Sequence, residues 1–171
     1  ELLLSDSTNV GSSSGSSGGA GSEASVAEAL ETLIRSAPRR VLVGLFSSNV
    51  QRLISLGAIA NRTGRRIVLL GRSLRGHVET AQDLGHLRWE SSLRATDAEL
   101  ATLHPSEVLV LAGGTQAEAG SALTRIAGAS HPAFSLQTGD SVILSCRIIP
   151  GNERRVSRMY NQLLRQEVEL F

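Results

Sequence analysis

Short apolar runs alternate along the chain with segments whose apolar residues recur at helical spacing. The apolar runs are rich in Val, Ile and Leu, which is typical of strands buried on both faces of a parallel sheet. The segments between them have one apolar and one polar face, as surface helices do. The predicted strands span residues 41–46, 66–70, 107–112, 141–145 and 168–171. The predicted helices span residues 25–37, 49–62, 74–84, 96–103, 118–127 and 152–166.

This alternation predicts an α/β fold with three layers, in which helices cover both faces of a mostly parallel sheet. A length of 171 residues and a hydrophobic fraction of 41% are sufficient for one domain with a substantial core. Ser25 and Glu28 have the spacing of a capping box, as have Thr96 and Glu99, so helices are expected to open at Ser25 and Thr96. Residues 11–22 contain almost only glycine and serine, which predicts a flexible loop.

The charge and cysteine content exclude several function classes. The formal net charge is only +1, so the chain as a whole is not a strongly basic nucleic-acid-binding surface. All 17 basic residues are arginine, which excludes a Schiff-base lysine and a P-loop lysine. Cys146 is the only cysteine, so the chain has neither an internal disulfide nor a zinc site built from cysteines. With no membrane-length apolar run and no signal peptide, we expect a cytoplasmic protein without a membrane partner.

Hydroxyls, glycines, amides and arginines follow the predicted strands. Because ligands of open α/β sheets bind beyond the carboxyl ends of the strands, this composition favours a phosphate-bearing ligand. The alternative interpretation is that these residues are ordinary helix caps and turn residues. The segments concerned are residues 47–49, 71–73, 113–116, 146–147 and 150–153.

The histidines and the last helix give weaker signals. The four histidines have no metal-binding spacing, so we interpret each as a surface or capping residue. Arg154, Arg158 and Arg165 lie near one face of the last predicted helix. That arrangement fits either a solvated face or a nucleic-acid stripe. With so few aromatic residues, the chain has little material for stacking bases.

Six segments together resemble the β-CASP region of the metallo-β-lactamase-fold nucleases, with ribonuclease J as the nearest likeness. They occur in the family's order and span nearly the whole chain. The resemblance implies a Rossmann-like β-CASP domain. The segments are LLLSDSTN (2–9), SEASVAEAL (22–30), LFSSNVQR (45–52), LLGRS (69–73), AGGTQAEAGSALTRIA (112–127) and PGNERRVSR (150–158).

The resemblance also implies a metal centre in the intact nuclease. Members hold two zinc ions with an HxHxDH motif, which is absent from this chain, and with further ligands. Asp6 matches the aspartate that bridges the two metals, and both roles, catalytic and metal-binding, follow for it. Glu23 matches the acidic motif that supports a metal-ligating histidine and is the second catalytic candidate. A bridging carboxylate suits two-metal hydrolysis of a phosphodiester.

RNA contacts are implied for a second group of residues. In ribonuclease J the region that matches the segment after the third strand and the end of the fourth receives RNA phosphates, including the terminal 5′-phosphate. The candidate phosphate-binding residues are therefore Gly114, Thr115, Gln116, Ser145 and Arg147.

These observations predict the β-CASP domain of a zinc-dependent ribonuclease J-like nuclease. Residues 1–9 would end the metallo-β-lactamase region, residues 10–22 would form the loop, and residues 23–171 would form the β-CASP domain. Its partners would be RNA and the metallo-β-lactamase domain of the same parent chain, and the parent could form a homo-oligomer. The chain begins with Glu1, as an excised piece would, and alone it should bind no zinc and cleave no RNA. The alternatives are a non-catalytic nucleotide- or phosphosugar-binding module and a DNA-repair nuclease of the same superfamily.

Overall fold

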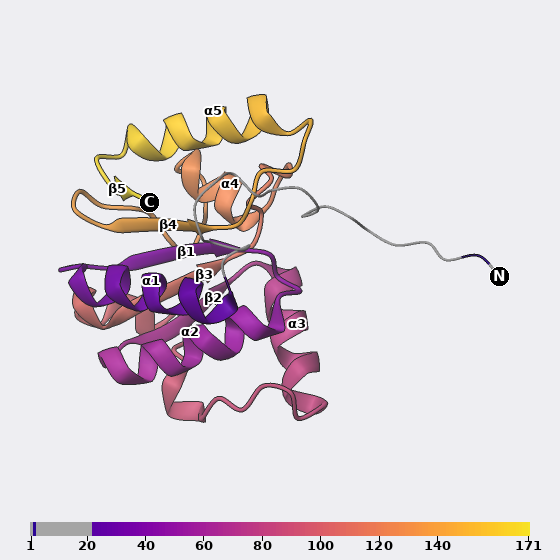
Figure 1. Ribbon diagram of the computed structural model, residues 1–171. Coiled ribbons are helices and arrows are strands. Elements are labelled where there is room, and N and C mark those ends of the chain that lie inside the picture. The colour runs from indigo at the N-terminus through magenta and orange to yellow at the C-terminus, as the bar shows by residue number, and fades with distance from the viewer. Residues whose placement is uncertain (1, 3–21) are drawn as a thin grey trace.

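A five-stranded parallel sheet forms the centre of the computed structural model, which describes residue 2 and residues 22–171 (Figure 1). The strands lie in the order β2-β3-β1-β4-β5, so β1 occupies the middle. Their bounds are Val41–Leu45 for β1, Arg66–Leu70 for β2, Val108–Ala112 for β3, Ser141–Ser145 for β4 and Glu169–Leu170 for β5. The predicted α/β fold with a parallel sheet is confirmed.

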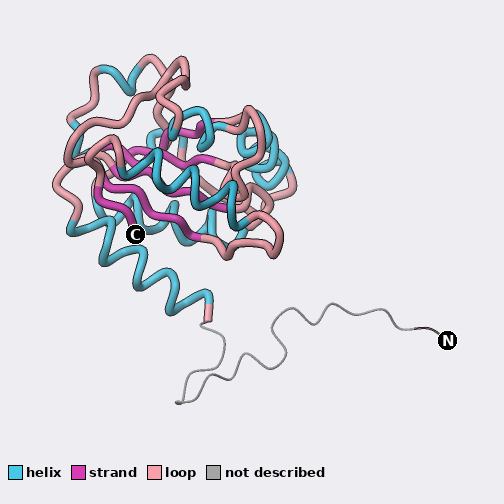
Figure 2. The backbone as a smooth tube through the Cα atoms, turned by 90° about the horizontal axis from the view of Figure 1, so that it is seen from above, coloured by secondary structure: helices cyan, strands magenta, loops and turns pink. Residues whose placement is uncertain are grey.

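Helices cover both faces of this sheet. Helices α1, α2 and α3 lie on one side, and α4 and α5 lie on the other (Figure 1). Figure 2 looks down on the α4 and α5 side, with the strands running side by side beneath the helices. The helices are α1 (Glu23–Ser36), α2 (Val50–Thr63), α3 (Arg72–Asp83), α4 (Ala122–Ala127) and α5 (Glu153–Leu164), with short 3₁₀ helices at Ser91–Leu93, Glu99–Ala101 and Pro105–Glu107. None of the helices in residues 22–171 is long and apolar enough to span a membrane.

Successive residues of the central strands enter opposite cores. Val41 and Val43 of β1 pack toward α1 and α2, whereas Leu42 between them packs toward the other helical layer. All of β1 and β3 is buried, because side chains of a strand alternate between two faces and both faces are covered here. The continuous apolar runs of the sequence therefore correspond to strands in the middle of three layers.

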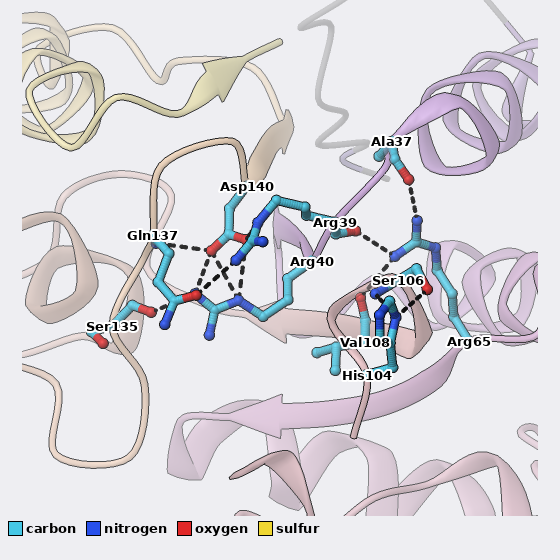
Figure 3. Close-up of polar contacts among 10 residues, drawn as sticks. All are labelled: Ala37, Arg39, Arg40, Arg65, His104, Ser106, Val108, Ser135, Gln137 and Asp140. Carbon is cyan, nitrogen blue, oxygen red and sulfur yellow. Dashed lines mark hydrogen bonds and ion pairs between the residues drawn. The ribbon is translucent and has the colours of Figure 1, made fainter. Parts of the chain in front are cut away.

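Arginines hold the amino edge of the sheet together (Figure 3). The Nε of Arg40, just before β1, donates to Oδ2 of Asp140, just before β4, over 2.9 Å. The guanidinium of Arg65 is buried, and this burial lowers its pKa. It donates to four main-chain carbonyl oxygens, those of Ile34, Ala37, Arg39 and Val108. The arginines at this edge thus connect strands and turns through ion pairs and hydrogen bonds.

Helix starts differ from the predicted ones. The side chain of Ser22 accepts a hydrogen bond from the main-chain N–H of Ser25, so Ser22 is the cap of α1 and the prediction of Ser25 was wrong. Thr96 and Glu99 do form reciprocal capping bonds, yet only a 3₁₀ turn follows them. Of the two predicted capping boxes only the one at Thr96 and Glu99 forms, and the sequence did not show how short the helix after it would be.

Helix α4 is shorter than predicted because the chain before it turns. Ala117 and Gly120 have φ values of 55° and 73°, which a right-handed helix does not allow. Ser121 then caps the helix, its hydroxyl accepting from the N–H of Thr124 over 3.3 Å. The remaining predicted elements agree with the structure to within about two residues. Asp6 and the glycine-serine segment up to residue 21 lie outside the described residues.

We expect Gly57→Ala in α2 to destabilise the protein. A Cβ there would lie 2.0 Å from Nε1 of Trp89, which packs on the helix at this point. Relieving that overlap costs about 1–3 kcal/mol. Because Trp89 is the only tryptophan, its fluorescence emission should also shift. Chemical denaturation followed by fluorescence measures both effects.

The matched control is Gly76→Ala in α3, where a Cβ would meet no atom within 4 Å. That change should raise the free energy of unfolding by about 0.5–1 kcal/mol, because alanine is the better helix former. Equal stability of Gly57→Ala and the unaltered chain, with unchanged emission, would show that Trp89 does not pack on α2.

Candidate functional site

The loops that follow β1, β3 and β4 meet at the carboxyl edge of the sheet. Strand β1 is paired with β3 on one side and with β4 on the other. Its last residue, Leu45, is aligned with Ser145 of β4. Because the strands are parallel, residues 46–49, 113–121 and 146–152 therefore emerge side by side. This is the edge at which the sequence predicted a ligand.

Arg52 forms the centre of this edge. Its guanidinium is buried, the side chain being 9% exposed. Nε and Nη2 donate to the two carboxylate oxygens of Glu23 over 3.1 and 3.0 Å. Nη1 donates to the hydroxyl oxygen of Ser145. One side chain thus connects the first turn of α1, the first turn of α2 and the end of β4.

The electrostatics of this cluster determine the charge of Glu23 and the hydrogen-bonding capacity of the Ser145 hydroxyl. The hydrogen bonds and charge of Arg52, with a smaller contribution from Asn49, hold the pKa of Glu23 below its usual range. Glu23 is therefore ionised at neutral pH. The Ser145 oxygen accepts from a cation, so its own hydrogen remains available for another acceptor. A hydroxyl polarised in this way is a good donor to an anion.

Gln116 binds the neighbouring loop with its whole side chain. The residue is 4% exposed. Its Nε2 donates to the carbonyl of Arg147 over 2.9 Å, and its Oε1 accepts from the N–H of Ile149 over 2.8 Å and from Nδ2 of Asn152 over 3.3 Å. Its own N–H donates to a carboxylate oxygen of Glu118 over 3.1 Å. Gln116, which the resemblance assigned to phosphate binding, thus uses its side chain to hold residues 147–152 in place.

Thr115 is also internal. It is 2% exposed and lies against Gly44 of β1, where a Cβ would approach its methyl group to 3.2 Å. Its side chain is hydrogen-bonded to Cys146, whose thiol pKa is nonetheless raised, mainly by burial. The thiol is therefore protonated at neutral pH and is not a nucleophile.

Gly114 has a packing reason to be glycine. Its φ is 104°, and a Cβ would lie 2.1 Å from the hydroxyl of Ser121. The residue is partly exposed, and its N–H donates to no acceptor within residues 22–171. Among the predicted phosphate-binding residues, Gly114, Ser145 and Arg147 reach the surface at this edge, whereas Thr115 and Gln116 support it from within.

The described residues do not by themselves make a metal site. No group of three or more His, Cys, Asp or Glu side chains in residues 22–171 could hold a metal ion. Two of the four histidines have capping or turn roles: the Nδ1 of His104 accepts from the N–H of Ser106, and that of His131 from the N–H of Ala133. Asp6 lies outside the described residues, so its predicted metal-bridging role is not placed.

Sequence reasoning missed Arg52. The residue lies within a segment that carried the family resemblance, but no role was assigned to it there. The signal was its position in α2: Arg52 is four residues before Leu56, on the side of the helix that is buried. A charged residue in the buried register of a helix requires a partner, and the acidic Glu23 was already a candidate.

We expect Arg52→Gln to raise the pKa of Glu23 to the ordinary carboxyl range. The pair contributes stability at neutral pH, and that contribution is lost as the pH falls through the lowered pKa of Glu23. The variant should therefore be less stable at neutral pH, by about 1.5 kcal/mol because Glu23 is 44% exposed, with a flatter acid side of its stability curve. A carboxyl NMR titration and denaturation at several pH values measure these effects.

Arg35→Gln is the control, since Arg35 pairs with Glu31 elsewhere on α1. It should leave the pKa of Glu23 unchanged. An Arg52→Gln variant in which the pKa of Glu23 stays low would show that another group holds this carboxylate.

Comparison with known proteins agrees with the resemblance found in the sequence. The model of the ribonuclease J β-CASP domain family matches residues 38–163. Ribonuclease J of Helicobacter pylori strain B128 is 39% identical over an alignment of 171 residues, and this alignment covers 99% of this chain and 24% of that protein. Ribonuclease J 1 of Streptococcus pyogenes serotype M3 is 34% identical over 168 residues, 98% of this chain and 29% of that protein.

Ribonuclease J of Mycobacterium tuberculosis strain H37Rv is 39% identical over 156 residues, 91% of this chain and 27% of that protein. The chain thus spans about a quarter of the length of these curated relatives. The family match runs from before β1 to the last turn of α5 and includes the three loops of the carboxyl edge, whereas Glu23 lies before it. The chain belongs to the ribonuclease J β-CASP domain family.

Proposed function

We propose that this chain is the RNA-binding part of a zinc-dependent ribonuclease J-like nuclease and that it holds RNA phosphates at the carboxyl edge of its sheet. The observation that carries the proposal is the hydroxyl of Ser145, which accepts from the buried guanidinium of Arg52 and keeps its own hydrogen for an acceptor. Membership of a nuclease family supports a phosphodiester backbone as the source of that acceptor.

The groups on the loops beside Ser145 have the chemistry to bind a phosphate. The N–H of Gly114, on the loop after β3, can donate a directional bond to a phosphate oxygen. Arg147 is exposed two residues beyond Ser145 and supplies positive charge. Because Gln116 fixes the carbonyl of Arg147 and the N–H of Ile149, this loop is held in place before any ligand arrives. A preorganised donor set loses less entropy on binding.

Hydrolysis is proposed for the intact nuclease and not for the described residues. A zinc site needs three or four protein ligands, and residues 22–171 bring no such group together. The two zinc ions that the resemblance implies would therefore need ligands from the metallo-β-lactamase domain, with Asp6 as the contribution of this chain. Glu23 would accept a hydrogen bond from a histidine at that centre, in an orientation that Arg52 sets.

We expect a short 5′-monophosphorylated RNA to shift the main-chain amide resonances of residues 113–116 and 145–149. Ser145→Ala should weaken binding about 10-fold, since a hydrogen bond to a charged group contributes about 1.5 kcal/mol. Ser36→Ala, at the end of α1 near the opposite edge, is the matched control and should leave the affinity unchanged. NMR titration of labelled protein measures both affinity and location.

Two outcomes of that titration would contradict the proposal. Shifts confined to the amino edge, around Arg40 and Asp140, would place the ligand elsewhere. Much tighter binding of a mononucleotide or phosphosugar than of RNA at the same residues would favour a small-molecule module.

We also expect the 171-residue chain alone to bind no stoichiometric zinc and to cleave no RNA, because Asp6 offers a single carboxylate and a stable site needs three or four ligands. Metal analysis of protein purified without chelators and an RNA cleavage assay measure these properties. RNA turnover that Asp6→Ala abolishes would show that the chain holds a complete catalytic centre.

A further inference from the structure

The outer face of α5 carries a row of exposed arginines. Arg154 and Arg158 lie in α5, and Arg165 is its C-cap residue with helical backbone angles. Their spacing of i, i+4 and i+11 places them on one side of the helix, and we call them the α5 arginine face. The opposite side of the helix is buried and packs on the sheet through Val156, Met159 and Leu163. The arginines therefore lie on the side of the helix that faces away from the core. Helix α5 itself forms the outer layer on its side of the sheet (Figure 1).

This face differs from other arginine positions in the chain. Seven arginines form ion pairs within the described residues, and none of them belongs to α5. The only acidic residue of the helix is Glu153, whose carboxylate accepts from the N–H of Gly151 over 2.8 Å at the helix start. No acidic residue follows in the sequence until Glu167. The positive charge of the face is thus not neutralised by its own helix.

The α5 arginine face begins where the candidate phosphate site ends. Asn152, directly before α5, donates through Nδ2 to Oε1 of Gln116 over 3.3 Å. Gln116 in turn holds the carbonyl of Arg147. From Arg154 to Arg165 the helix rises about 16 Å, which corresponds to about five stacked nucleotides of a single strand. A strand that leaves the edge beside Arg147 could therefore continue along the helix.

We propose that the α5 arginine face binds the phosphate backbone of single-stranded RNA that extends beyond the carboxyl edge. The proposal rests on the proposed function, because it takes the RNA at that edge as its starting point. The face has arginines for phosphates but no exposed aromatic ring for stacking, since Tyr160 is largely covered. Binding there should therefore be independent of base sequence and strongly dependent on salt.

The test compares RNAs of two lengths on the 171-residue chain. A 5′-monophosphorylated trinucleotide can occupy only the edge, whereas a dodecanucleotide of the same base can also reach α5. The variant is the triple change Arg154→Gln, Arg158→Gln and Arg165→Gln, which keeps helix propensity nearly unchanged, as circular dichroism should confirm. Affinities are measured by fluorescence anisotropy over a range of salt concentrations.

The triple variant should lose affinity for the dodecanucleotide at least about 10-fold at low salt and keep its affinity for the trinucleotide. The plot of log affinity against log salt should become shallower by about 2, since each phosphate contact on a single strand contributes about 0.7. Between about 50 and 200 mM salt, the unaltered chain should therefore lose about 20-fold more affinity than the variant. Lysine at the three positions should restore both properties, because a point charge suffices for phosphate.

The matched control removes the same charge from the opposite helical layer. Arg35, Arg62 and Arg88 lie on α1, on α2 and in the loop after α3, and all three are exposed. Changing these three to glutamine should leave dodecanucleotide binding within about twofold, because charges beyond a Debye length are largely screened. An equal loss in this control would overturn the proposal, since net charge would then explain the effect.

Other outcomes separate this proposal from the proposed function. Unchanged dodecanucleotide affinity and salt dependence in the α5 variant overturn the proposal, whatever the trinucleotide does. A trinucleotide that shifts no amide at the edge contradicts the proposed function. If the dodecanucleotide still binds through α5 in that case, the face is supported as an RNA surface. Binding of the unaltered chain to anionic phosphatidylserine vesicles, lost in the variant while RNA binding stays, assigns the face to lipid and overturns the proposal.

Discussion

The arrangement of the carboxyl edge depends on the buried guanidinium of Arg52. A charged group removed from water is stable only where ion pairs and hydrogen bonds replace its hydration. Glu23 supplies the opposite charge from 29 residues away in the sequence, and Ser145 supplies an acceptor from 93 residues away. Leu30 and Ile34 of α1 already share a hydrophobic core with Ile143 of β4. Arg52 adds a polar link that joins the start of α1 to the end of β4 at the carboxyl edge.

The two edges of the sheet use arginine in different ways. At the amino edge, Arg40 pairs with Asp140, and Arg65 donates hydrogen bonds to main-chain carbonyls. The arginines there therefore connect parts of the protein to one another. At the carboxyl edge, the buried Arg52 is paired with Glu23 and donates to Ser145, whose hydroxyl keeps its own hydrogen as a donor. The α5 arginines continue from that edge on the outside of the molecule. Buried arginines thus connect elements at both edges, and only at the carboxyl edge do we propose a ligand.

The sequence predicted the strands better than the helices. Strands 66–70 and 141–145 were predicted with their observed bounds, because continuous runs of apolar and β-branched residues have few other uses in a chain of this size. The predicted start of α4 was wrong because Ala117 has a positive φ. This angle results from the tight turn and cannot be inferred from an alanine in the sequence. The carboxyl edge was predicted to hold the ligand because strands alternating with helices indicate a parallel sheet, whose strands all end at one edge.

The roles of single residues at that edge were harder to predict. Gln116 and Thr115 were assigned to phosphate through the resemblance to ribonuclease J, yet the side chains of both are buried and contact the loop after β4. Arg52 was passed over because its partners are distant in sequence, and nothing local indicates which carboxylate or hydroxyl a buried arginine will reach. Long-range hydrogen bonds of this kind appear only once the strands have been ordered.

The central claim is that the carboxyl edge of the sheet is a preformed phosphate-binding surface. A crystal structure of the chain with a 5′-phosphorylated dinucleotide tests it most directly. We expect the phosphate to accept hydrogen bonds from the hydroxyl of Ser145 and the N–H of Gly114, with the bonds of Arg52 and Gln116 unchanged. A dinucleotide bound elsewhere on the molecule, or a phosphate that displaces Arg52 from Ser145 in order to bind, would contradict it.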